Sequence, residues 1–544
     1  MLVNLKGSLA LQTLKMTLGK ALRLNKLRTA LLTAILSLFA SSAFAKKSQI
    51  LIFRGEAFDG SSAHKKLLKS GLRFRRLKKS KMVMIEETDK LLATDFRSDS
   101  EFSFVEEDRQ WHRTDFSASN SSPDNDSWVP DFFEGANPSP AQNLEAETSV
   151  VLGIIDSGIR INHPYFQGLL ASNATESNGQ AGVDDDHNGY VDDINGVNTY
   201  SKTLSVQSGG IEHGTHVASL AALSIKQSPL DSAGAVKILP INFMGNGESG
   251  STSSALLAID YAMERGSRVI NLSWGGAGIE SYSQALYEAM EDLYRQDILV
   301  ITAAGNDSNN NDQMPFFPAN YNLPNLMSVA SVTPEYGYQN FLMGMGLSFF
   351  SNFGSSSVDV AAPGDLNFSG SSIGLLGANG GSDASQNPFV RMMGTSMAAP
   401  VVSGVAAVLR ALNKDLSAYD TKQLLIESSK QSGEQMGLDI IGGVIAPTAA
   451  YAMARTTNAS GTNPAIPADP VRGMGNESSL NTERAGGCAQ VYRIASAGPP
   501  DGPLDGPLDG PLGGNSLLLF SSLYLISQLL RSRKSLLRNF GNCV

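Results

Sequence analysis

The stretch Gly394–Pro400 has the sequence GTSMAAP and leads into an apolar run that ends near Leu412. We expect a helix across this run, with Ser396 at its start among small residues that let another backbone approach closely. The N-terminus of a helix offers unpaired N–H groups and a dipole that favour a developing negative charge. Ser396 is therefore a candidate nucleophile, although a serine at this position also fits a plain N-cap.

A second motif, VVLGIIDSG at residues 150–158, places Asp156 directly after a buried apolar strand. Gly158 permits a sharp turn behind the carboxylate. Taken alone, Asp156 fits the cap of a loop as well as it fits a catalytic carboxylate.

A third motif, HGTHVA at residues 213–218, opens an Ala-rich helix predicted over 214–224. His213 is thereby held at a helix N-terminus and is a candidate general base. His216 lies three residues further along, near the same helical face, so zinc binding is an alternative. No HExxH pattern or third ligand lies nearby in the sequence, and we interpret His216 as a structural residue.

The chain around these motifs alternates apolar strands with helices. Strands are predicted at 150–155, 236–241, 269–272, 298–303 and 327–332, and helices at 252–264, 282–294 and 398–412. This alternation predicts an α/β fold with a mainly parallel sheet that helices cover on both faces. Such sheets carry their sites at the carboxyl ends of the strands.

The three motifs together resemble the subtilisin-like serine protease (subtilase) family over residues 145–455. The order Asp156, His213, Ser396 is the order of the subtilisin triad, and no catalytic residue is replaced. The resemblance implies a three-layer α/β domain and a secreted serine endopeptidase, made as a self-processing zymogen. It further implies protein or peptide substrates, an acyl-enzyme intermediate, a monomer, and no cofactor for catalysis.

The resemblance also implies roles for residues outside the triad. Asn306, after the apolar strand 300–304, would donate to the oxyanion together with the N–H of Ser396. Ser273, Trp274 and Gly275 would line the pocket for the residue before the cleaved bond. The apolar surroundings of this pocket favour broad or hydrophobic specificity.

Two rival functions predict other patterns. A peptide-binding protein of the same fold without activity would show a damaged triad or no oxyanion donor. A lipid or ester hydrolase would show a GxSxG elbow and the order Ser, Asp, His. Neither pattern is present.

Residues 46–113 are predicted to form a small α+β unit before the peptidase domain, which we expect over 114–455. FSFVEED at 102–108 resembles the closing strand of the inhibitory prosegments of subtilases, so the chain's own propeptide is an expected inhibitor. Maturation cleavage is expected between Asp108 and Asn120. The basic stretch 73–81 is interpreted as a solvated face.

An acidic loop at residues 184–193 begins like an EF-hand, with Gly189 at its sixth position and Asn195 instead of Glu at its twelfth. A solvated loop is the alternative to a calcium site that stabilises the fold. The predicted calcium ligands are Asp184, Asp186, Asn188, Tyr190 and Asp192.

The two ends of the chain carry addressing signals. Residues 1–45 combine a basic segment, a short apolar run and an AFA sequence, which predicts a secretory signal and a secreted or cell-surface protein. A low-complexity linker is predicted over 456–512. The apolar and basic tail at 513–544 is either a bacterial sorting signal with transient membrane attachment or a merely sticky segment.

Composition excludes other classes of protein. The formal net charge of −10 gives no support for nucleic-acid binding. Only Cys488 and Cys543 occur, both near the C-terminus, so a disulfide framework does not hold the main domain together.

Overall fold

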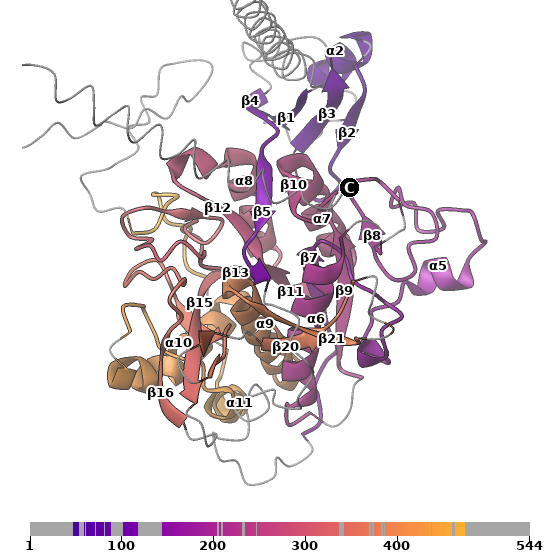
Figure 1. Cartoon of the computed structure of the whole chain (residues 1–544). Helices are drawn as coiled ribbons and strands as arrows, with labels where there is room; N and C mark the ends of the chain where they lie inside the picture. The colour runs from indigo at the N-terminus through magenta and orange to yellow at the C-terminus, as the bar shows by residue number, and fades with distance from the viewer. Residues whose placement is uncertain are drawn as a thin grey trace, which may run out of the picture. The chain divides into compact units, whose positions relative to one another are not determined.

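The computed structural model describes residues 47–473, with gaps at 54–58, 89–101, 118–143 and 337–341 and at several stretches of one to three residues. The predicted signal segment, the C-terminal tail, both cysteines and most of the predicted linker lie outside the described residues. Within them, a small α+β unit precedes a larger α/β domain (Figure 1).

A parallel sheet forms the centre of the larger domain. Six strands lie in the order β15-β13-β11-β7-β9-β8 with every neighbouring pair parallel, and β17 also pairs in parallel with β15. The strands are β7 (Val150–Asp156), β8 (Val197–Asn198), β9 (Val236–Asn242), β11 (Ser267–Leu272), β13 (Leu299–Ala303), β15 (Leu326–Tyr336) and β17 (Val360–Pro363). The mainly parallel sheet that the sequence predicts is confirmed.

Helices cover both faces of this sheet because its strands are apolar on both sides. In β13, Ile301 belongs to one hydrophobic core and its neighbour Val300 to the other, as expected for side chains that alternate along a strand. One core contains α6 (Glu212–Lys226), α9 (Thr395–Leu412), α10 (Ala418–Met436) and α11 (Pro447–Thr456); the other contains α7 (Thr252–Glu264) and α8 (Gln284–Arg295). The three-layer architecture is therefore confirmed as well.

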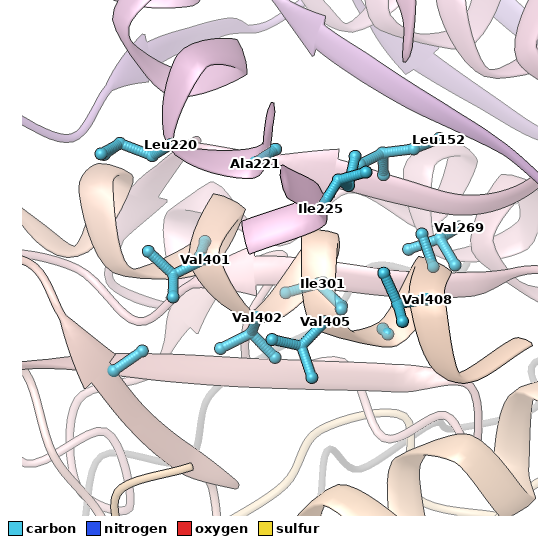
Figure 2. Close-up of a cluster of buried hydrophobic side chains, with 14 of the residues drawn as sticks. Leu152, Leu220, Ala221, Ile225, Val269, Ile301, Val401, Val402, Val405 and Val408 are labelled. Atoms are coloured by element: carbon cyan, nitrogen blue, oxygen red, sulfur yellow. The ribbon is translucent and has the colours of Figure 1, made fainter. Parts of the chain in front are cut away.

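Helix α9 lies at the centre of the first core and begins three residues before the predicted start. All 18 of its residues are buried, and Val401, Val402 and Val405 pack among side chains of α6 and the sheet (Figure 2). The helix is long and apolar enough to cross a membrane, but here it is wholly enclosed by protein. Because both sides of α9 are packed, the position of Ser396 in its first turn is fixed by the core.

The N-terminal unit is an antiparallel sheet with one described helix. Its strands lie in the order β2-β3-β1-β4, so the closing strand β4 pairs with β1. The elements are β1 (Lys47–Phe53), α2 (Ser62–Ser70), β2 (Phe74–Arg76), β3 (Met82–Thr88) and β4 (Phe102–Glu107). The described elements of this unit thus combine a helix with strands, and β4 covers most of the FSFVEED stretch at 102–108.

The basic stretch 73–81 is not simply a solvated face. The backbone N–H groups of Lys78 and Lys79 donate to the carboxylate of Asp260 on α7, at 2.8 and 2.6 Å. The guanidinium of Arg75 lies over the ring of Tyr190, 5.0 Å from its centroid. Backbone N–H groups and the Arg75 guanidinium of this stretch therefore contact the main domain.

Packed chain continues past residue 455, where we expected the linker to begin. The segment 463–473 returns to the sheet, and Arg472 donates two 2.9 Å hydrogen bonds to the buried carboxylate of Asp359. Lys422 Nζ lies 3.0 Å from the same carboxylate. Burial raises the pKa of Asp359, but the two cations outweigh it and hold the pKa below its usual value.

Replacing Arg472 with methionine is expected to destabilise the domain by about 3 kcal/mol, because it leaves a buried carboxylate with only one of its cations. Chemical denaturation of the Ser396→Ala background, which avoids self-digestion, measures the loss. Lys414→Met is the control, since Lys414 makes exposed ion pairs, with Glu147 at 3.7 Å and Asp415 at 3.5 Å, and should cost less than about 1 kcal/mol. Equal losses for both variants would contradict the role given to Arg472.

Candidate active site

Asp156 and His213 meet at the carboxyl edge of the sheet. Asp156 is the last residue of β7, and His213 lies in the first turn of α6. The His213 Nδ1 atom is 2.7 Å from Asp156 Oδ1, and both side chains are fully buried. Because an ionised carboxylate only accepts, Nδ1 carries the proton, and Nε2 is left as the basic nitrogen.

The charge balance around His213 favours its protonated form. Burial lowers the pKa of His213, but the carboxylates of Asp156 and Asp115 raise it, and the net pKa lies above the usual value. Asp115 Oδ1 lies 3.9 Å from Nε2. The imidazolium that forms when His213 accepts a proton is therefore stabilised from both sides of the ring.

Ser396 lies in the first turn of α9 and is fully buried. Its hydroxyl donates to the backbone oxygen of Ser273 at 2.9 Å and lies 2.7 Å from Thr114 Oγ1. His213 Nε2 has no hydrogen-bond partner among the described residues. Asp156 and His213 are thus in direct contact, whereas the Ser396 hydroxyl is hydrogen-bonded to Ser273 and not to His213.

Asn306 follows β13, and its amide has a fixed orientation. Asn306 Oδ1 accepts from both the N–H and the hydroxyl of Thr395, at 2.9 Å each. The Nδ2 group is buried and has no partner among the described residues. The orienting role of Thr395 was not recognised in the sequence, although Thr395 lies directly before Ser396.

An extended segment of the N-terminal region occupies the groove beside Ser396. Strand β5 (Gln110–Arg113) lies between β10 (Ser249–Ser251) and β12 (Trp274–Ala277), antiparallel to both (Figure 1). The next residue, Thr114, donates its N–H to the oxygen of Ser273 at 3.4 Å. Beyond it, β6 (Phe116–Ser117) pairs with β21 (Phe389–Met393), so the chain is held on both sides of Ser396.

The carbonyl group of Thr114 faces the N-terminus of α9. Its oxygen accepts from the N–H of Ser396 at 3.3 Å. A Cβ atom built on Gly394 would lie 2.6 Å from this oxygen and 3.1 Å from Asn306 Nδ2. A side chain at position 394 would therefore collide with the Thr114 carbonyl, and the small residue keeps open the space shared by both donors.

The predicted substrate-binding residues all contact this segment or support it. Trp274 and Gly275 pair with Arg113 and His112 across β12 and β5. Trp274 packs inward: it is fully buried, donates to the oxygen of Ile155 at 2.9 Å, and lies under the ring of Trp111 with 5.7 Å between centroids. The indole N–H of Trp111 donates to Thr252 Oγ1 at 2.9 Å, a contact that the sequence did not reveal.

The acidic loop brings together a slightly different set of residues from the one predicted. Carboxylate oxygens of Asp184, Asp186 and Glu176 lie within 4.8 Å of one another, the only such group among the described residues. Asp192 instead accepts from the N–H of Gly182 at 2.8 Å. Glu176 was not predicted as a ligand, because it lies eight residues before the loop motif.

The loop's other predicted oxygen donor shapes the turn. Asn188 Oδ1 accepts from the N–H of Tyr190 at 2.8 Å, while the N–H of Asn188 lies 2.9 Å from Asp184 and 3.1 Å from Asp186. Amide groups of Asn173 and Asn188 and backbone N–H groups of the loop donate to these carboxylates, and the ligand atoms that the cluster offers are carboxylate oxygens, the donor chemistry that a calcium ion prefers. The residues present therefore fit calcium.

The geometry does not support zinc binding by His213 and His216. Neither ring belongs to a group of three or more possible metal ligands among the described residues, and His216 Nε2 lies 3.1 Å from the oxygen of Leu375 while His213 Nδ1 is bonded to Asp156. Burial lowers the pKa of His216 to about 4, so the ring is neutral. Its Nε2–H group donates a hydrogen bond to the backbone oxygen of Leu375. His216 is a structural residue that packs against the strand β20 (Leu375–Ala378).

Comparison with known proteins agrees with this geometry. The profile described as the Subtilase family matches residues 147–444, more than half of the chain. This chain belongs to the subtilase family.

Individual relatives cover the same region of this subtilase. It is 30% identical to thermitase of Thermoactinomyces vulgaris over 279 residues, which are 51% of this chain and 80% of thermitase. It is 28% identical over 283 residues to subtilisin-like protease 1 of Plasmodium berghei, and these are 51% of this chain and 45% of that protein. The match thus spans less than half of the Plasmodium protein.

Solved structures agree in fold. The crystal structure of fervidolysin from Fervidobacterium pennivorans, a keratinolytic enzyme related to subtilisin, has a TM-score of 0.54 at 19% identity, covering 78% of this chain and 62% of fervidolysin. The epidermin leader peptide processing serine protease EpiP from Staphylococcus aureus has a TM-score of 0.52 at 18% identity. The match covers 76% of this chain and 100% of EpiP. At such low identity these similarities support the fold alone.

Proposed function

We propose that this subtilase is a secreted serine endopeptidase, made as a precursor that cuts its own chain between Thr114 and Asp115. The observation that carries the proposal is the Thr114 carbonyl, whose oxygen accepts from the N–H of Ser396 at 3.3 Å while strands on either side hold the chain. This bond lies inside the interval 108–120 in which maturation is expected from the sequence.

The residues around this bond divide the chemistry among them. Ser396 Oγ turns from Ser273 to His213, attacks the carbonyl carbon of Thr114 and gives its proton to His213 Nε2. The oxygen of Thr114 becomes an oxyanion that accepts from the N–H of Ser396 and from Asn306 Nδ2. Asp156 holds the tautomer of His213 and stabilises the imidazolium.

The second half of the reaction releases both products. His213 passes its proton to the nitrogen of Asp115 as the C–N bond breaks, which leaves Thr114 as an ester on Ser396. A water molecule then attacks the ester, with His213 taking its proton, and Ser396 is regenerated with a free carboxylate on Thr114. Peptide substrates would replace β5 between β10 and β12 and react in the same way.

The N-terminal unit is anchored as an inhibitor would be. Asp108 accepts from the N–H of Ser253 at 2.8 Å, at the N-terminus of α7. Glu106 accepts from the N–H of Ala285 at 3.1 Å, at the N-terminus of α8. Two carboxylates therefore meet the positive ends of two helices, which supports a propeptide that stays bound after the cut.

Two further properties belong to this proposal. The cluster of Glu176, Asp184 and Asp186, with Asn188 beside it, would hold a calcium ion that stabilises the loop under the propeptide. Residues 1–45 would direct export, and the tail at 513–544 would attach the precursor to a membrane for a time. The export and attachment rest on sequence patterns only.

The test is the N-terminus of the purified protein. We expect wild-type protein to begin at Asp115 by mass spectrometry and to react with a fluorophosphonate serine probe. The Ser396→Ala precursor is expected to keep residues 46–114 and to remain unlabelled. A wild-type protein that stays uncut, and that does not label after removal of the propeptide with calcium present, would make it a peptide-binding protein without activity.

The pH dependence of self-cleavage gives a prediction with a defined sign. His213 must be neutral to accept a proton, so the rate falls as the pH drops through its pKa. Asp115 raises that pKa, and Arg113 lowers it. Asp115→Asn should therefore move the acid limb of the profile to lower pH, and Arg113→Gln should move it to higher pH. Precursor conversion across a pH series measures both; shifts in the same direction would contradict the assignment.

A further inference from the structure

Phe316 packs against Gly275 of β12, the strand that also pairs with β5. It begins the short strand β14 (Phe316–Phe317), which pairs antiparallel with β12. Only 4% of Phe316 is exposed. Its ring therefore fills space between segments that, in the proposed function, hold the reacting residue.

Two of those segments each present a glycine, which has no side chain, to the ring of Phe316. Gly275 lies two residues after Ser273, whose oxygen accepts from the N–H of Thr114. Gly305 directly precedes Asn306, the candidate oxyanion donor. Two glycines that face each other normally leave room for a side chain of the bound substrate.

Here the aromatic ring takes that room. A Cβ atom built on Gly275 would lie 2.2 Å from Phe316 Cε1, and one built on Gly305 would lie 2.8 Å from Phe316 Cδ2. Opposite edges of one ring thus press against both glycines.

The ring is held in place by its own backbone. The N–H of Phe316 donates to Asn320 Oδ1 at 2.9 Å, and its oxygen accepts from the N–H of Asn320 at 2.8 Å. Asn320 in turn donates to the oxygens of Asn311 and Arg472. This network fixes the backbone of Phe316, so the ring can leave the space between the two glycines only by rotating about its own side-chain bonds.

We infer that Phe316 closes the primary specificity pocket, so that this enzyme cuts polypeptides after small residues such as threonine, serine or alanine. The inference rests on the proposed function and refines it. Thr114 satisfies the requirement: its side chain stays near the nucleophile, with Oγ1 2.7 Å from Ser396 Oγ and 3.4 Å from the Ser273 oxygen. This proposal sets a size limit, in contrast to the broad or hydrophobic specificity that the sequence favours.

The direct test uses peptides with the sequence of residues 110–117, in which position 114 is Thr, Ala, Leu or Phe. Matured wild-type enzyme is expected to cleave the Thr and Ala peptides with a kcat/KM about 10²-fold above that of the Phe peptide. Phe316→Gly should raise cleavage of the Phe peptide about 10²-fold, and Phe316→Ala should raise it by a smaller factor. Phe349→Ala is the control, because Phe349 is 70% exposed, and it should leave the profile unchanged.

A second design tests the same pocket within the precursor. Thr114→Phe should block self-cleavage in the wild-type background, and the double variant Thr114→Phe with Phe316→Gly should restore it. A merely structural role for Phe316 would not give this rescue. The wild-type peptide profile keeps the test valid even if Phe316 variants fail to fold.

The outcomes distinguish a failure of the closed pocket from a failure of the proposed endopeptidase function. If wild-type enzyme cleaves the Phe peptide as fast as the Thr peptide, the closed pocket is refuted and the endopeptidase remains. If it cleaves no peptide and does not react with the fluorophosphonate probe, the proposed function is refuted and the closed pocket falls with it.

Discussion

Replacing His213 with alanine is expected to slow self-cleavage by about 10⁶-fold, the size of the loss known for the corresponding residue of subtilisin itself. Ser396 is a weak nucleophile unless a base takes its proton, and Asp156 presents His213 Nε2 for that purpose across a 2.7 Å hydrogen bond. Loss of the base and loss of the nucleophile disable the same step. The double variant with Ser396→Ala should therefore be no slower than either single variant.

The measurement is the first-order conversion of purified precursor to the form that begins at Asp115. His216→Gln is the matched control, since His216 is equally buried but is bonded to Leu375 and not to the triad. We expect this variant to lose stability while the molecules that fold still cleave themselves. Self-cleavage by His213→Ala at a rate within tenfold of wild type would exclude His213 as the base.

Replacing Asn306 with alanine is expected to lower the rate by about 10²–10³-fold, again the loss known for the corresponding donor of subtilisin. The Nδ2 group is buried and unpaired among the described residues, and Thr395 holds the amide so that this group is free. Asn306 Nδ2 would donate to a negative charge that forms only in the transition state, so its removal should lower kcat far more than it changes KM.

Two variants control this experiment. Asn309→Ala removes an exposed amide of the same loop, which bonds the oxygen of Met314, and should change kcat by less than twofold. Thr395→Val removes the hydroxyl bond to Asn306 but keeps the N–H bond, so a partial loss is expected. An Asn306→Ala enzyme with normal kcat would show that the N–H of Ser396 stabilises the oxyanion without it.

Much of this architecture could be predicted from local patterns. Each core strand is a short apolar run bounded by turns, and the strands carrying Asp156 and Asn306 end where the apolar pattern ends. Position then follows from topology, because parallel strands bring their carboxyl ends to one edge. Asp156 and His213, which lie 57 residues apart in the sequence, are 2.7 Å apart at this edge.

The residues that the sequence did not reveal depend on contacts without a local pattern. Phe316 looks like any apolar residue of a short strand, and its role depends on two glycines elsewhere in the chain. Thr252 is an ordinary residue of the α7 N-terminus until Trp111 packs beside it. Glu176 lies before the acidic loop, in a short helix that no ligand spacing includes. Such roles arise from packing between distant segments, which periodicity does not encode.

The position of β5 also governs how activity would appear over time. Before the cut, the segment that fills the groove is tethered, so its local concentration is far above that of any substrate. After the cut it becomes a separate molecule whose inhibition depends on total protein concentration, and each freed enzyme can destroy further copies of the inhibitor. Activity should therefore emerge after a lag and then rise steeply, with a lag that shortens when a trace of mature enzyme is added.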